Sequence, residues 1–329
     1  MKKKVFILFA LSFLLGCNSK SEEIISLYSQ KSIHELDNNY LLSDLRLVQA
    51  LNGRLFFNDW SNSQILILDN KLQYKNHFGN RGQGPGEFQW IGSLYAYNDN
   101  IYALDDAGNR IHIYSNDGAF IRTIQPDRFP IGITNLRFTV INDQLITPAS
   151  IYSDSDLLIF DINSSKLLQE IKFNQNGGVA SINSYIVSSF QDKVILVNRM
   201  KPIVQMLNLE GSLVDEYDLT KIKELEGLWQ HYESNKNQTN FQSYTTFIRD
   251  AYVDGIYLYI LCEPWPGRDS YAYIIRLSLE ENRIKQERVF KIQGTNSSAI
   301  YFRSIAVADD ILYAVEGSNM TINMFHLNF

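Results

Sequence analysis

Short runs of apolar residues alternate with polar turn residues along most of the chain. The clearest stretch is 78–124, FGNRGQGPGEFQWIGSLYAYNDNIYALDDAGNRIHIYSNDGAFIRTI. Its apolar runs are separated by turn residues such as Asn98-Asp99 and Asn116-Asp117-Gly118, which favour hairpins. The pattern predicts a unit of four β-strands, at Ile91–Tyr97, Asn100–Asp105, Arg110–Ser115 and Ala119–Gln125.

The third strand of this unit recurs along the chain. An apolar residue before a short turn marks it at six positions, namely Ile65, Ile111, Leu157, Val204, Ile274 and Ile322. The successive spacings are 46, 46, 47, 70 and 48 residues, and an insertion at 219–243 accounts for the long one. A period near 46 with four strands per unit predicts an all-β, six-bladed β-propeller. Two β-sandwich domains are the alternative, but they would not keep this register.

The two ends of the chain are expected to close the ring. The sixth unit begins at Phe302 and ends at Phe329 after its third strand. The run at 23–30, EIISLYSQ, is strand-like and precedes the first blade. We expect it to supply the missing outer strand, which would cover an open sheet edge. The prediction is one monomeric propeller domain over 23–329, with the insertion 219–243 between blades 4 and 5.

The first residues have the form of an export signal. Three lysines at 2–4 precede the apolar run Val5–Leu15, which is too short to span a bilayer. The sequence Leu-Leu-Gly-Cys at 14–17 resembles the bacterial lipobox, in which the cysteine is lipidated after cleavage. We therefore predict a signal peptide at 1–16, lipidation of Cys17 and a tether at 17–22. An ordinary secretory signal that happens to contain a cysteine is the alternative.

Charge and cysteine content exclude several kinds of partner and of covalent cross-link. The chain has 36 acidic and 30 basic residues, and loss of the signal's three lysines gives 27 − 36 = −9. This acidic balance argues against nucleic acid and against a charge-driven membrane contact, so the lipid would be the only membrane anchor. With Cys17 acylated, Cys262 has no partner for a disulfide.

The Gly-rich loop and the strands after it, FGNRGQGPGEF and NIYALDDAGNRIHIYSNDGAFIRTI, resemble an NHL-type repeat. Together with the lipobox, they resemble the six-bladed NHL/TolB-like propeller lipoproteins of Bacteroidetes, a family largely without assigned function. That resemblance implies a propeller at the outer membrane, on its periplasmic side or at the cell surface. The full motif covers only blade 2. Blade 1 has Ser63-Gln64 where the motif has Asn-Arg, and blade 6 has Thr321 in place of Arg110.

Four tryptophans are expected on one face of the ring. In a four-stranded meander, the loops between second and third strands and those between blades leave on the same face, because alternate strands reverse direction. This predicts a common face for Trp60, Trp90, Trp229 and Trp265. They either fill gaps between blades or form an aromatic mouth for a partner protein, peptide or glycan. The insertion begins at helical spacing, which predicts an amphipathic helix over the channel mouth, either a lid or a decorated blade junction.

The Gly-rich loop at 79–87 does not predict a phosphate site. A strand follows it, whereas phosphate binding requires a helix N-terminus. Its glycines are expected to turn the chain between blades at positive φ. Arg81 and Glu87 then lie near the channel mouth, where they contact a ligand or form a salt bridge across blades. With Asp105 and Arg110 of the repeat motif, they complete the candidate ligand-binding set.

Acidic residues near the ends of second strands raise a separate possibility. Asp59, Asp105, Glu263 and Glu316 could cap turns or hold calcium on the propeller axis. The chain has no motif typical of a nucleophilic or zinc hydrolase. We therefore expect a binding protein without catalytic residues or cofactor. The alternative is a propeller hydrolase or lyase that uses channel carboxylates and calcium.

Overall fold

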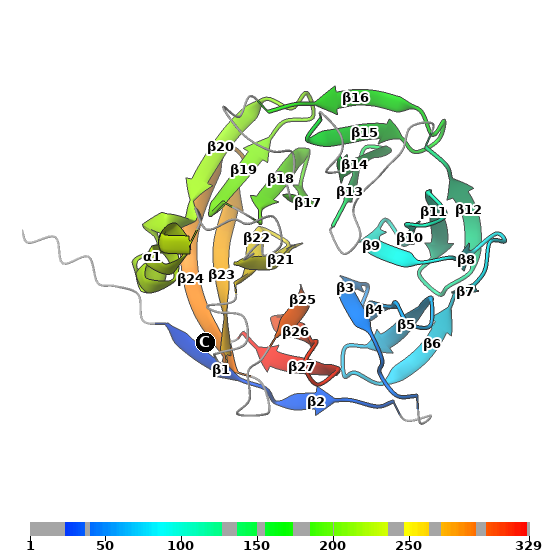
Figure 1. The fold of residues 1–329 in the computed structure, drawn as a ribbon, viewed down its shortest axis with the longest axis horizontal. Coiled ribbons are helices and arrows are strands. Elements are labelled where there is room, and N and C mark those ends of the chain that lie inside the picture. The colour runs from blue at the N-terminus through cyan, green and yellow to red at the C-terminus, as the bar shows by residue number, and fades with distance from the viewer. Residues whose placement is uncertain are drawn as a thin grey trace, which may run out of the picture.

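The computed structural model describes residues 24–36, 40–126, 137–149, 155–173, 185–199, 201–235, 247–262, 271–293 and 301–327. These residues form six sheets of four or five strands, arranged as blades around a central axis (Figure 1). The protein is an all-β, six-bladed propeller. In each blade we name the strands A to D from the axis outward.

The first three blades each contain four consecutive strands. Blade 1 consists of β3 (Leu45–Leu51), β4 (Arg54–Asp59), β5 (Gln64–Asp69) and β6 (Tyr74–Phe78). Blade 2 consists of β9 (Ile91–Tyr97), β10 (Asn100–Asp105), β11 (Arg110–Ser115) and β12 (Phe120–Ile124). Blade 3 consists of β13 (Thr139–Ile141), β14 (Gln144–Pro148), β15 (Leu157–Asp161) and β16 (Leu167–Ile171). The short strands β7 (Asn80–Arg81) and β8 (Glu87–Phe88) pair within the Gly-rich loop.

The remaining blades differ in how they end. Blade 4 consists of β17 (Tyr185–Phe190), β18 (Lys193–Asn198), β19 (Ile203–Leu207) and β20 (Leu213–Asp218). Blade 5 contains β21 (Ile248–Asp254), β22 (Tyr257–Cys262), β23 (Tyr271–Glu280) and β24 (Arg283–Gln293). Blade 6 has three strands from the C-terminal segment, β25 (Phe302–Ala308), β26 (Ile311–Glu316) and β27 (Thr321–His326).

The repeat predicted from the sequence is confirmed residue by residue in blade 2. Its first three strands have the predicted bounds, and the fourth is one residue shorter at each end. The six residues that set the period all lie in C strands and are fully buried, namely Ile65, Ile111, Leu157, Val204, Ile274 and Ile322. One apolar position per blade, packed between neighbouring sheets, therefore sets the period of the sequence.

The A–B hairpins have turns with positive φ. Asn98 and Asp99 have φ of 46° and 61°, and Asp309 and Asp310 have 52° and 57°. Positive φ at both central residues is the mark of type I′ turns, whose twist matches that of paired strands, and Asn and Asp tolerate this conformation. This turn chemistry brings acidic side chains to one face of the ring, which we call the A–B face. The opposite face, where B–C loops and interblade connections leave, is the D–A face.

The ring is closed by an N-terminal strand, but not by the run that we expected. The predicted run contains β1 (Ile25–Tyr28), which pairs in parallel with β24 as a fifth strand of blade 5. The next strand, β2 (Lys31–Ile33), pairs antiparallel with β27 and completes blade 6. Figure 1 shows the two strands in succession along the outside of these blades. One segment thus covers the outer edges of two neighbouring sheets.

The insertion before blade 5 folds at the rim of the ring. It contains the short helices η2 (Leu219–Lys221) and η3 (Lys223–Leu225), followed by α1 (Glu226–Asn235). Figure 1 shows α1 outside the ring, beside β20 and β24, and not over the axis. The helix was predicted correctly, but its expected place over the channel mouth is wrong. Of the two interpretations, the structure supports the decorated blade junction for these residues.

Candidate functional site

Two of the four tryptophans meet on the D–A face. Trp60 follows β4, Trp90 precedes β9, and their ring centroids are 6.1 Å apart at an interplanar angle of 40°. Trp90 is 52% exposed, although large aromatic side chains are usually covered. The guanidinium carbon of Arg46 lies 3.9 Å from the centroid of the Trp60 ring, in cation–π geometry. Trp60 and Trp90 therefore lie on one face, as predicted, and their rings meet at the junction of blades 1 and 2.

Charged groups hold this aromatic pair in place. Asp44 accepts hydrogen bonds from Arg46, at 2.9 Å from Nη2, and from Arg303 of blade 6. The backbone N–H of Trp60 donates to the carbonyl oxygen of Asp44 at 3.0 Å. Burial alone would raise the pKa of Asp44, but the two guanidinium groups hold it below its ordinary value. We call the surface formed by Asp44, Arg46, Trp60, Trp90 and Arg303 the Trp–Arg corner.

The other two tryptophans do not add to this surface in the described structure. Trp229 of α1 is 4% exposed and packs in the apolar cluster between blades 4 and 5. It has the role of a core residue at a blade junction, which was the alternative to a place in an aromatic mouth. Trp265 lies outside the described residues.

The Gly-rich loop lies over the outer strands of blade 2, away from the channel mouth (Figure 1). Gly79 and Gly86 have φ of 81° and 73°, as the interblade-turn interpretation requires. The carboxylate of Glu87 accepts a hydrogen bond from the N–H of Gly84 at 2.8 Å, within its own loop. Arg81 donates to the carbonyl oxygen of Ser61 at 3.3 Å. No bond between Arg81 and Glu87 is found in the described structure, so the salt bridge that we considered is not formed.

Arg110 and Asp105 fasten that loop to its blade. Nε of Arg110 donates to the fully buried carboxylate of Asp105 at 3.0 Å. Its two terminal nitrogens donate to the carbonyl oxygens of Gln83 and Glu87, at 2.7 and 3.1 Å. The second oxygen of Asp105 accepts from the N–H of Trp90 at 3.0 Å. These contacts indicate that Arg110 of the repeat motif positions the loop, and that Asp105 positions both Arg110 and Trp90.

The carboxylates considered for calcium are hydrogen-bonded near the turns of their own blades. Asp59 accepts from Tyr40, Ser43 and Asn62. Glu316 accepts from side chains at 318–323, and Asp105 from Arg110 as above. Glu263 lies outside the described residues. Within the described part of the chain, no group of three or more His, Cys, Asp or Glu is arranged to hold a metal ion.

A buried ion pair crosses the axis of the propeller. Arg137, just before β13, donates to both carboxylate oxygens of Asp250 in β21, each at 2.6 Å. It also donates to the carbonyl oxygens of Val48 in blade 1 and Ile305 in blade 6. Both side chains of the pair are 3% exposed. One guanidinium therefore connects blades 3, 5, 6 and 1. The sequence analysis did not detect this pair, because its members are 113 positions apart.

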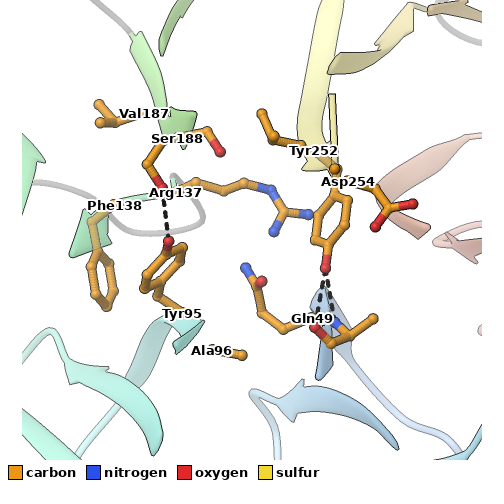
Figure 2. A pocket seen from close by; sticks show the side chains of 13 residues that line it. Gln49, Tyr95, Ala96, Arg137, Phe138, Val187, Ser188, Tyr252 and Asp254 are labelled. Carbon is orange, nitrogen blue, oxygen red and sulfur yellow. Dashed lines mark hydrogen bonds between the residues drawn. The ribbon is translucent and has the colours of Figure 1, made fainter. Parts of the chain in front are cut away.

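A pocket lies on the A–B side of that ion pair (Figure 2). Its volume is about 210 Å³, and five of the six A-strand segments contribute to its wall. Its polar walls come from Gln49, Tyr95, Ser188, Ser189, Tyr252 and Asp254. Tyr95 and Ser189 bridge blades 2 and 4 through a hydrogen bond of 3.0 Å. The hydroxyl of Tyr252 lies 3.2 Å from both the N–H and the carbonyl oxygen of Ala50.

The family comparison agrees with this architecture. The family model described as "6-bladed beta-propeller", DUF5128, matches residues 34–197. Together, this match and the ring of six sheets identify the chain as a six-bladed β-propeller. No curated protein matches it. No helix among the described residues is long and apolar enough to cross a membrane.

Solved structures show the same fold at low sequence identity. A Bacteroides fragilis protein described as exported has a TM-score of 0.57 and 15% identity, over 92% of this chain and 99% of that one. A Bacteroides vulgatus member of the DUF4221 family has a TM-score of 0.59 and 13% identity, over 91% and 97%. A Staphylococcus aureus virginiamycin B lyase has a TM-score of 0.50 and 13% identity, over 88% of this chain and 84% of that one. At these identities the similarity establishes the fold and does not extend to ligands.

Proposed function

We propose that the protein is a lipid-anchored, outer-membrane β-propeller that binds a partner protein, peptide or glycan through the Trp–Arg corner. The supporting observation is the exposed Trp90 ring, placed against Trp60, whose own ring packs against the Arg46 guanidinium. Aromatic rings and arginines are enriched at binding hot spots, where they contribute most of the affinity. The surface is also pre-organised, since Asp44 fixes both guanidinium groups, and little side-chain entropy is lost on binding.

The anchor is proposed from the sequence. Cys17 ends the lipobox-like segment, and the tether 17–22 precedes β1 in the sequence. The exported Bacteroides fragilis neighbour, which shares the fold, is consistent with this location. Metabolic labelling with a fatty-acid analogue tests it. We expect label on the wild-type chain and none on Cys17→Ala, which should leave the membrane fraction. A membrane-bound Cys17→Ala chain would contradict the anchor.

Binding is tested with the unlipidated chain 18–329, which contains every described element of the closed ring. It is applied to a glycan array and to detergent-solubilised envelope proteins, beside the double variant Trp60→Ala/Trp90→Ala. The matched control is Leu168→Ala/Leu213→Ala, because these side chains are 53% and 56% exposed on outer strands. We expect ligands retained by the wild type and the control to be lost by the tryptophan variant. Equal retention by all three chains would reject the Trp–Arg corner as the binding surface.

A further inference from the structure

The axial pocket contains polar atoms that no described residue satisfies. Gln49 is 3% exposed, and its Nε2 donates to the carbonyl oxygen of Leu94 at 3.0 Å. Its Oε1 has no hydrogen-bond partner among the described residues, and Figure 2 shows the amide pointing into the pocket. This acceptor is therefore available to a ligand that carries an N–H or O–H group.

The pocket also has an unpaired carboxylate at its edge. Asp254 lies at the end of β21, where it is half-buried and lines the pocket. Its carboxylate makes no ion pair or hydrogen bond with any described residue. Arg137 is the cation that also lines the pocket, but both oxygens of Asp250 already neutralise it. Asp254 thus contributes a net negative charge to the pocket.

The rim around this pocket is acidic. The A–B turns bring Asp99, Asp143, Asp192, Asp309 and Asp310 to the same face as Asp254. Within the described ranges, only Asp192 of this group forms an ion pair, with Lys193 at 2.6 Å. The other basic side chains nearby, Arg54, Arg122 and Arg276, belong to B, C or D strands, further from the axis. Carboxylates around a recessed pocket concentrate cations at its opening.

We propose that the axial pocket binds a small organic cation, a protonated amine that also carries a hydrogen-bond donor. The ammonium group pairs with Asp254, and a second donor reaches Oε1 of Gln49. The volume of about 210 Å³ equals roughly seven water molecules at about 30 Å³ each, so the ligand is smaller than a typical drug. The rings of Tyr95 and Tyr252 provide walls suited to the methylene groups of such an amine. Among the described residues, Asp254 is the only unpaired carboxylate that lines the pocket, so the arrangement suits an amine better than a chelated metal ion.

The test is isothermal titration calorimetry of the chain 18–329 with 1,4-diaminobutane, and with 1,4-butanediol as its uncharged counterpart. We expect saturable binding of one diamine per chain and no heat from the diol. Asp254→Asn keeps the shape of the pocket but removes its charge. It should weaken binding about tenfold or more, since a charge-assisted hydrogen bond is replaced by a neutral one.

Two further variants distinguish binding inside the pocket from nonspecific attraction of the amine by the negative charges around it. Asp192→Asn removes one negative charge from the rim, outside the pocket, where it is already paired with Lys193. It should weaken binding far less than Asp254→Asn. Ala96→Leu adds bulk to the pocket wall while retaining every carboxylate, and should abolish binding with little change in the unfolding midpoint. No saturable binding, binding that is insensitive to Ala96→Leu, or equal weakening by Asp192→Asn and Asp254→Asn would each overturn the proposal.

Discussion

The two faces of the ring differ in whether their key carboxylate is paired with a cation. On the D–A face, the Asp44 carboxylate is shared by Arg46 and Arg303, and the Trp60 ring stacks on one of these guanidinium groups. On the A–B face, Asp254 has no partner among the described residues, and it borders an open pocket. Groups that are already paired form a rigid surface suited to a large partner. Groups left unpaired are suited to a small counter-ion.

The Arg137–Asp250 pair lies between the two faces. It lies across the axis, on the D–A side of the pocket, and its contacts with four blades hold the ring together. The two faces can therefore be changed independently, and the predictions below use this separation.

The largest expected effect follows from breaking the axial pair. Asp250→Ala leaves the Arg137 guanidinium buried without its counter-charge and also removes the acceptor for the N–H of Ile305. Removing one partner of a buried pair costs about 3–5 kcal/mol of unfolding free energy. Because Asp250 bonds to several groups, we expect the upper part of that range in urea denaturation. The double variant Arg137→Met/Asp250→Leu should recover part of the loss, and no recovery would contradict a role based on charge pairing.

The buried tryptophan tests the division between core and binding surface. Trp229→Ala should cost about 3 kcal/mol, the lower end for removal of a buried aromatic ring. We expect the lower end because the indole N–H of Trp229 is buried without a partner in the described structure, and its loss relieves that cost. Trp229→Phe should be close to neutral for the same reason. Neither variant should reduce partner binding, and reduced binding by well-folded Trp229→Phe would extend the binding surface to α1.

A smaller effect of opposite sign is expected at Asp254. Burial, followed by the charges of Asp310 and Asp309, raises the pKa of its carboxyl above the ordinary value of 3.8. Above that raised pKa, the ionised carboxylate is less favourable in the folded than in the unfolded chain. Asp254→Asn should therefore raise the Tm at pH 7. The gain should shrink as the pH falls through the raised pKa and vanish below the ordinary value. A lower Tm for Asp254→Asn at pH 7 would contradict this.

The architecture could be predicted from the sequence, since it depends on local patterns repeated many times. The six buried C-strand residues gave the period and the number of blades. The strand-like run at 23–30 was also visible, but the choice between β24 and β27 depends on pairing partners some 265 or more positions away, as in Ile25 with Phe290. The two candidate strands, β1 and β2, are too similar and too short to be assigned by composition.

The binding surfaces were predictable only in part. Opposite strand directions correctly put Trp60 and Trp90 on one face, because this follows from topology alone. The same argument could not show that α1 would turn its tryptophan into the junction of blades 4 and 5. The axial pocket was not predicted, because Gln49, Tyr95 and Asp254 are ordinary residues in three separate A strands. Only closure of the ring brings them together.

The most direct test of the account measures the affinity of one ligand retained on the Trp–Arg corner for three chains. These are the wild type, Trp60→Ala/Trp90→Ala, and Asp254→Asn on the opposite face. Loss of hot-spot residues costs about 2 kcal/mol or more, or roughly 30-fold in Kd. The account predicts at least that loss for the tryptophan variant and an unchanged Kd for Asp254→Asn. Equal affinity of the tryptophan variant and the wild type would contradict it.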